Sequence, residues 1–497
     1  MSRKLTASLL CDFYKVSHRE QYPDKTEKVY STWTPRATRL AGINYAVSAG
    51  QQLFIKEFLI DYFNENFFSL PKTEVVNQYT RMIKYALGVQ NPDASHIAAL
   101  HDLGYLPLSI KSLPEGTIVP LRVPIFTIEN TDKRFFWVTN YIESLLSCEL
   151  WQISNSATIA NEFRKRLDHY CDVTGGDPTF VQFQGHDFSF RGMGGLYSAM
   201  KSGMGHLLSF SGTDTIPAIE GSEIYYNANI EKELVGTSIP ATEHSVMSAN
   251  GTEDEYSVFK RIITEIYPNG PISIVCDTVD FWNVVGNVLP RLKGEIMARE
   301  GHPILNKVVV RPDSGDPELI ICGDPNASTE IERKGLVEAL WDTFGGTITS
   351  KGFKSLDSHI GAIYGDAITL ERATKISEQL IAKGFASTNV VYGIGSFTYQ
   401  YNTRDSLGFA MKSTFAIVDG VDRQIFKDPK TDNGIKKSQK GRVAVVDKAG
   451  VLTLVDHLYS NDVIEGDLLE EIFRDGKLLV DDSLSNIRAR LETYRNR

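Results

Sequence analysis

Four short apolar runs between residues 272 and 395 each end in a polar or glycine-rich turn. The runs cover 272–276, 308–310, 359–364 and 389–392. Short runs rich in β-branched residues are typical of strands that are buried on both faces. The segments between them, at about 278–299, 328–344 and 369–384, place apolar residues at helical spacing. Repeated strand–helix units of this kind predict an α/β fold with a parallel, barrel-like sheet.

The residues that most suggest chemistry follow these strands directly. They are Asp277 after the first run, Arg311 and Asp313 after the second, Gly365 and Asp366 after the third, and Gly395 and Ser396 after the fourth. In a parallel sheet all these positions lie on one rim, where α/β folds hold their sites. An arginine suits a phosphate, and a carboxylate suits Mg²⁺ or a sugar hydroxyl. A salt-bridged strand end is the alternative for Arg311 alone, but it does not explain why the pattern recurs.

Three further segments carry polar side chains in places that suit binding. In 185–192, Phe188 and Arg191 could hold a planar ring and a phosphate, although an isolated phenylalanine is more often a core residue. Asp214 follows a glycine turn and could bind a ligand or cap the next helix. His244 stands beside Glu243 at a predicted helix start. It could serve as a base, a metal ligand or a phosphate acceptor.

Composition narrows the class of protein. The 62 acidic and 52 basic residues give a net charge of −10, which argues against nucleic acid or an anionic membrane as the main partner. The five cysteines include no C-x-x-C pair, so we expect a reducing compartment and no zinc site. No stretch approaches the ~20 apolar residues of a membrane span, and no signal-peptide pattern is visible. These features predict a cytoplasmic protein.

The two ends of the chain differ in pattern from its middle. Residues 118–128 carry prolines that suit edge or bent strands, and residues 443–454 have the pattern of a β-hairpin. The simplest arrangement joins 1–150 and 405–497 in one β-rich domain. Residues 151–404 would then form the α/β domain that carries the site.

A set of short motifs runs in order along nearly the whole chain. They occupy 12–18, 21–23, 186–188, 191–192, 212–215, 240–245, 311–315, 365–366, 426–429 and 440–442. In combination they resemble the type II phosphoribosyltransferase family, and within it the enzymes that use nicotinamide. The resemblance implies an incomplete α/β barrel with a β-rich, sandwich-like domain, and a homodimer with shared active sites. The implied reaction transfers phosphoribosyl from phosphoribosyl pyrophosphate to nicotinamide, giving nicotinamide mononucleotide and pyrophosphate in NAD salvage.

The resemblance also implies a role for each candidate residue. Phosphates would be bound by Arg191 and Arg311, ribose hydroxyls by Asp313, Gly365 and Asp366, and the ribose phosphate by the backbone amides of Gly395 and Ser396. Phe188 and the partner subunit's Tyr14 would stack on the pyridine ring, Asp214 would accept from the carboxamide, and Ser273 and Asp277 would line the same cavity. The partner would also contribute Arg404, Lys412 and Lys427 to the phosphates.

Mg²⁺ would be held through pyrophosphate, with Asp313 as a candidate ligand and no dedicated protein metal site. ATP would be a co-substrate that phosphorylates His244, with Asp277 orienting the ring.

Two rival hypotheses stay open. A nicotinate or quinolinate phosphoribosyltransferase could be built on the same fold, or the chain could be a catalytically silent binding protein.

Overall fold

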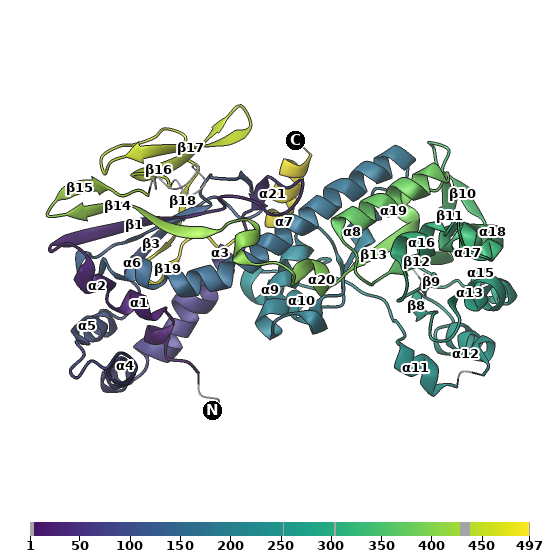
Figure 1. The fold of residues 1–497 in the computed structure, drawn as a ribbon, viewed down its shortest axis with the longest axis horizontal. Coiled ribbons are helices and arrows are strands. Elements are labelled where there is room, and N and C mark those ends of the chain that lie inside the picture. Colours follow the sequence, from purple (N-terminus) through teal and green to yellow (C-terminus); the bar gives the residue numbers. More distant parts are fainter. Residues whose placement is uncertain (1–3, 252, 303–304, 428–437, 497) are drawn as a thin grey trace. The chain divides into compact units, whose positions relative to one another are not determined.

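The chain folds into two compact units in a computed structural model that describes residues 4–251, 253–302, 305–427 and 438–496 (Figure 1). Unit 1 comprises Met1–Thr158, Gly221–Ala228 and Asn402–Arg497, and unit 2 comprises Ile159–Glu220 and Asn229–Tyr401. The boundaries expected from sequence lie at 150/151 and 404/405. Helices α7 (Glu143–Thr174) and α10 (Ile216–Tyr226) each contribute residues to both units.

Unit 2 is built on a six-stranded parallel sheet with strand order β7-β6-β13-β12-β9-β8. The strands are β6 (Gly185–Asp187), β7 (Gly212–Thr213), β8 (Ile272–Val275), β9 (Val308–Arg311), β12 (Ile360–Tyr364) and β13 (Val390–Ile394). Nearly all their residues are buried, as expected for a parallel sheet covered on both faces. All four strands predicted from the apolar runs are confirmed, and so is the α/β fold.

One short segment joins the two edges of this sheet. Thr237 bridges to Gly212 in edge strand β7, and Ala241 bridges to Ser273 in edge strand β8, both in parallel. The Thr242 hydroxyl accepts a hydrogen bond from the backbone N–H of Val275, 2.9 Å away, in place of a strand carbonyl. The sheet therefore curls into an incomplete barrel, and residues 237–242 close the gap between its edges.

Helices accompany the strands of this unit (Figure 1). They are α8 (Val181–Gln184), α9 (Leu196–Leu207), α11 (His244–Ala249), α12 (Glu255–Arg261), α13 (Phe281–Asn283), α14 (Leu289–Arg291), α15 (Lys293–Met297), α16 (Pro317–Cys322), α17 (Glu330–Lys334), α18 (Leu336–Phe344), α19 (Leu370–Ala382) and α20 (Ser396–Tyr399). Of these helices, α16, α18 and α19 lie close to β9, β12 and β13 (Figure 1). The helical segment predicted over 328–344 is confirmed as two helices, α17 and α18, because Gly335 separates them with a φ of 80°. The segment 278–299 is a series of short helical pieces rather than one uniform helix.

Unit 1 contains a seven-stranded antiparallel sheet, which confirms the predicted β-rich part made from both chain ends. Its order is β15 (Val421–Gln424), β14 (Ala410–Val418), β1 (Thr26–Thr34), β5 (Phe126–Asn130), β3 (Leu108–Ser112), β18 (Glu470–Arg474) and β19 (Lys477–Leu478). Two small sheets pair β2 (Tyr45–Val47) with β4 (Ile118–Pro120) and β16 (Arg442–Lys448) with β17 (Val451–Leu458). The β16–β17 pair is the hairpin predicted over 443–454, and Ala449 and Gly450 form its turn with positive φ.

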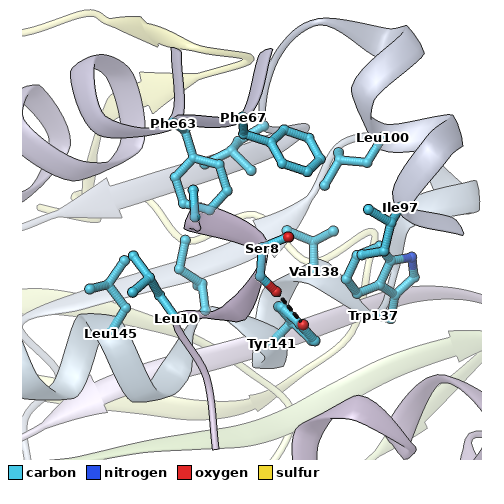
Figure 2. Close-up of a pocket in the computed structure, with 13 residues that line it drawn as sticks. Ser8, Leu10, Phe63, Phe67, Ile97, Leu100, Trp137, Val138, Tyr141 and Leu145 are labelled. Carbon is cyan, nitrogen blue, oxygen red and sulfur yellow. Dashed lines mark hydrogen bonds between the residues drawn. The ribbon is translucent and has the colours of Figure 1, made fainter. Parts of the chain in front are cut away.

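A small apolar cavity lies in unit 1 beneath residues 7–10 (Figure 2). Its volume of about 20 Å³ is enough for a single water molecule. Phenylalanine, leucine and isoleucine side chains form most of its wall, and the buried Ser8 hydroxyl has no hydrogen-bond partner among the described residues. The cavity is too small to bind a substrate. None of the helices in the described part of the chain is long and apolar enough to cross a membrane.

Candidate active site

Phe188 stands at the mouth of the barrel, where two glycines make room for its ring. A Cβ on Gly393 would lie 2.3 Å from the ring, and a Cβ on Gly365 would lie 2.9 Å from it. The side chain is only partly buried, and the His186 ring lies beside it with a centroid separation of 4.9 Å. Phe188 is therefore not an ordinary core residue, since part of it stays open to a ligand on the rim. The polar and aromatic residues of 185–190 alternate in the sequence, but they do not continue as a strand, because residues Phe190–Gly192 form a 3₁₀ helix.

Gly393→Ala is expected to displace the Phe188 ring. A Cβ at 2.3 Å cannot be accommodated without movement, and overpacking of this kind costs roughly 1–3 kcal/mol of stability. If the ring stacks on the substrate, losing about 1–3 kcal/mol of stacking raises the KM for the base about five- to 150-fold. Steady-state kinetics and a melting curve measure both effects. Gly365→Ala, with its longer 2.9 Å approach, should give the same change to a smaller degree, and an unaltered KM in both variants would contradict the stacking role.

Asp214 forms the polar end of the same mouth. Its Oδ1 accepts hydrogen bonds from His186 Nε2 at 2.9 Å and from Ser238 Oγ at 2.5 Å. Burial alone would raise the pKa of Asp214, but the bonds from His186 and Ser238 and the nearby Arg311 hold it below its usual value. The carboxylate is therefore ionised at neutral pH. Because it bonds to side chains on two other segments, it is not simply the cap of the helix that follows.

Arg311 points from the end of β9 toward the closing segment. One guanidinium nitrogen, Nη2, donates to the carbonyl oxygen of Thr242 at 2.5 Å, and the buried Nε has no partner among the described residues. Arg311 also forms no ion pair within the described part of the chain, so a salt-bridged strand end does not describe it. Its remaining donors can serve an anionic ligand.

His244 begins α11 and faces two rim carboxylates. Its Nε2 lies 3.7 Å from Asp277 Oδ1 and 3.7 Å from Asp313 Oδ2, and its Nδ1 lies 3.0 Å from Thr278 Oγ1. Asp277 is itself fixed, since its Oδ2 accepts from Asp313 N at 2.9 Å and from Ser314 Oγ at 2.6 Å. The imidazole is about half exposed. An oriented and accessible ring between two carboxylates suits a nucleophile or an acceptor of a transferred group.

The other rim positions are less tightly held. Arg191 and Asp366 are exposed. Gly192 packs so closely on Ser396 that a Cβ there would lie 2.0 Å from the Ser396 hydroxyl, which places the loop of Arg191 against the start of α20 at Gly395. The hydroxyl of Ser273 is buried without a hydrogen-bond partner among the described residues. No group of three or more His, Cys, Asp or Glu side chains in the described part of the chain could hold a metal ion.

Four of the candidate residues belong to unit 1. Tyr14 lies in α1 (Phe13–Val16), is exposed, and has Lys15 Nζ 5.0 Å from its ring centroid. Lys412 lies on β14 with an exposed side chain. Partial desolvation of its amine lowers its pKa, Glu143 opposes this, and the neighbouring cations Arg36, Lys15 and Arg404 lower it further. Lys427 is exposed at the end of the described segment, and residues 428–429 of its motif lie outside the described residues. All four of these side chains are accessible.

Sequence reasoning missed several residues that shape the site. His186 and Ser238 both hydrogen-bond to Asp214. The carbonyl oxygen of Thr242 accepts from Arg311. Thr278 hydrogen-bonds to His244, and Ser314 hydrogen-bonds to Asp277. His186 stands in the alternating run 185–190 and could have been found there. Thr242 lies in the motif at 240–245, whereas Ser238 gave no comparable signal.

The fold and the site together describe a class of protein with a parallel half-barrel, whose rim carries arginine, histidine and carboxylate side chains near an aromatic ring. Residues 183–477 match the nicotinate phosphoribosyltransferase (NAPRTase) family. The chain is 49% identical over 99% of its length to the nicotinamide phosphoribosyltransferase of Acinetobacter baylyi, covering 98% of that protein. This confirms the resemblance found in the motifs.

Two solved structures share the fold at low sequence identity. The nicotinate-nucleotide pyrophosphorylase of Pyrococcus furiosus has a TM-score of 0.58 at 15% identity, with 100% of this chain and 97% of that one covered. Human nicotinic acid phosphoribosyltransferase has a TM-score of 0.53 at 16% identity, with 98% and 93% covered. The chain belongs to the nicotinate phosphoribosyltransferase family.

Proposed function

We propose that this protein is a nicotinamide phosphoribosyltransferase. It would transfer phosphoribosyl from phosphoribosyl pyrophosphate to nicotinamide, giving nicotinamide mononucleotide and pyrophosphate for NAD salvage. The observation that carries the proposal is the ionised Asp214, held by His186 and Ser238 near the Phe188 ring at the barrel mouth. The 49% identical relative with this name supports the same assignment.

The base site is suited to an uncharged amide. The pyridine ring would stack on Phe188, and a carboxamide NH₂ would donate to Asp214, whose ionised carboxylate has acceptors and no donor. Ser273, whose buried hydroxyl has no hydrogen-bond partner among the residues that the structure describes, would line the same cavity. In the transfer, the bond from the anomeric carbon to pyrophosphate breaks, and the ring nitrogen forms a new bond to that carbon. The product ring is a cation, so the anionic Asp214 also favours the charge that develops.

The phosphoribosyl donor would occupy the rest of the rim. Arg191 and Arg311 would bind phosphates, Asp313 with Gly365 and Asp366 would bind the ribose hydroxyls, and the amides of Gly395 and Ser396 would bind the ribose phosphate. Asp313 is the residue that would contact Mg²⁺, and because no cluster of protein ligands lies among the described residues, the pyrophosphate oxygens would supply most of the coordination. The ion would neutralise charge on the leaving pyrophosphate.

ATP would act through His244. The exposed ring is held by Thr278 and lies 3.7 Å from both Asp277 and Asp313, which favours phosphate transfer from ATP to an imidazole nitrogen. Hydrolysis of that phosphohistidine would be coupled to product formation. The protein would work in the cytoplasm as a homodimer, in which Tyr14, Arg404, Lys412 and Lys427 complete the site of the partner subunit.

A direct assay separates this proposal from its rivals. Purified protein is supplied with phosphoribosyl pyrophosphate and Mg²⁺, and with either nicotinamide or nicotinate, in the presence and absence of ATP. We expect the mononucleotide to form from nicotinamide, faster with ATP. A preference for nicotinate would support the other substrate of this fold, and the absence of any turnover would support a silent binding protein.

His244→Ala is expected to abolish ATP hydrolysis and the stimulation of synthesis by ATP. Slower transfer without ATP should survive, because the glycosyl transfer itself needs no nucleophile from the protein. Phosphate release and mononucleotide formation measure the two activities. Thr278→Val, which removes only the hydrogen bond to His244 Nδ1, should weaken ATP hydrolysis without abolishing it. If a folded His244→Ala variant lost transfer without ATP as well, the histidine would act in glycosyl transfer itself.

A further inference from the structure

His206 is a buried histidine that lies outside the rim and takes no part in the chemistry proposed above. It stands near the end of α9, and both of its ring nitrogens are engaged. Nε2 lies 2.9 Å from the carbonyl oxygen of Gly212, and Nδ1 lies 2.6 Å from the hydroxyl of Tyr399. A carbonyl oxygen can only accept, so Nε2 carries the proton and Nδ1 accepts from Tyr399. Burial lowers the pKa of His206 to about 4, so the ring is neutral at physiological pH.

The two partners of His206 belong to different parts of the rim. Gly212 lies in β7, two residues before Asp214, whereas Tyr399 closes α20, the short helix that starts at Gly395 and Ser396. Strands β7 and β13 are not neighbours, because β6 lies between them. One imidazole therefore spans β6 and joins the loop proposed for the base to the loop proposed for the ribose phosphate.

The intervening strand is tied into the same arrangement. Asp187 of β6 is fully buried, and its Oδ1 accepts from the backbone N–H of Ser189, the residue after Phe188. Its Oδ2 lies 3.4 Å from the Thr213 hydroxyl. The negative charge of the carboxylate is also close enough to His206 to raise the pKa of that ring, against the larger effect of burial. The loops that carry Phe188, Asp214 and Ser396 are thus held from behind by one buried polar cluster.

We propose that His206 is a positioning residue that fixes the separation between the base-binding loop and the phosphate-binding loop. The inference rests on the proposed function, in which these two loops hold the two substrates. Transfer requires the ring nitrogen of the base to meet the anomeric carbon, and a displacement of about 1 Å at such a point can cost about 100-fold in rate. His206 would then act on the alignment of the two substrates rather than on the binding of either one.

Tyr399→Phe tests this by removing a single oxygen atom, and Tyr392→Phe is its matched control. Tyr392 is equally buried, but its hydroxyl bonds to Ser377 on α19 and touches neither loop. We expect Tyr399→Phe to lower kcat about 10- to 100-fold, with the KM of each substrate changed less than about threefold. Tyr392→Phe should leave all three constants near wild type.

His206→Gln provides a second variant, since its amide can still donate to Gly212 but leaves the Tyr399 hydroxyl without its partner. Combined with Tyr399→Phe it should lower kcat no further than either change alone, because both break the same bond. Equal losses in Tyr399→Phe and Tyr392→Phe, or a rise in one KM with kcat unchanged, would overturn the inference. Failure of the proposed function would show instead in the wild-type protein, as lack of turnover with nicotinamide.

Discussion

Asp214→Asn is expected to narrow the preference for nicotinamide over nicotinate by a factor of about 10³, measured as the ratio of the two kcat/KM values. The carboxylate of nicotinate would face the ionised Asp214 in a partly desolvated pocket, where a like-charge contact costs several kcal/mol. Each 1.4 kcal/mol of this cost lowers kcat/KM for nicotinate about tenfold. Asparagine removes the charge but keeps an oxygen that can accept from His186 and Ser238. Nicotinamide use should weaken, and the melting temperature should change little.

Asp316→Asn is the matched control for this prediction. Asp316 lies on the same rim, but its carboxylate caps α16 by accepting from the backbone N–H groups of Glu318 and Leu319. Asparagine also caps helices well, so selectivity should remain that of the wild type. A ratio unchanged in Asp214→Asn, or changed equally in both variants, would refute the role of Asp214 and reopen nicotinate as the substrate.

The sequence predicts best those elements whose own residues determine their structure, such as the buried strands of the parallel sheet. The β-branched runs at 272–276 and 308–310 are buried on both faces of the sheet, so their composition alone identifies them as strands. The rim followed from topology, because carboxyl ends of parallel strands share one edge. The helical segment expected over 328–344 is present, but Gly335, whose positive φ ends α17 before α18 begins, divides it into two helices.

The closing segment shows why the rest could not be predicted. Residues 237–242 have no apolar alternation, and their strand-like bridges depend on partners in β7 and β8. Ser238 reaches Asp214 across 24 positions of sequence, and His186 reaches it across 28. Such bonds depend on how the sheet curls, which no local pattern encodes. The hydrogen bonds that hold Asp214 could therefore not be predicted from the sequence, although Asp214 itself and the run that contains His186 could be singled out there.

The proposed sharing of active sites between subunits depends on how the candidate site residues are divided between the two units of the chain. Asp214, Arg311, Asp313 and His244 lie in unit 2, whereas Tyr14, Arg404, Lys412 and Lys427 lie in unit 1. Arg404 and Lys412 are near enough to each other, and to Arg36, to lower the pKa of Lys412. Like charges gathered in this way are costly unless an anion joins them. A phosphate of the donor bound to the partner subunit would be such an anion.

Mixing Arg311→Ala chains with Arg404→Ala chains is therefore expected to restore activity that neither variant shows alone. Each heterodimer has one site with both changes and one with neither, so random pairing gives about a quarter of wild-type activity. The mixture is co-refolded, heterodimers are counted by mass, and mononucleotide formation is measured. Mixing Arg311→Ala with Asp313→Ala is the control, because both changes fall in unit 2 and every site keeps at least one of them. Heterodimers that form but stay inactive in the first mixture, or recovery in the control, would show that the site is not shared in this way.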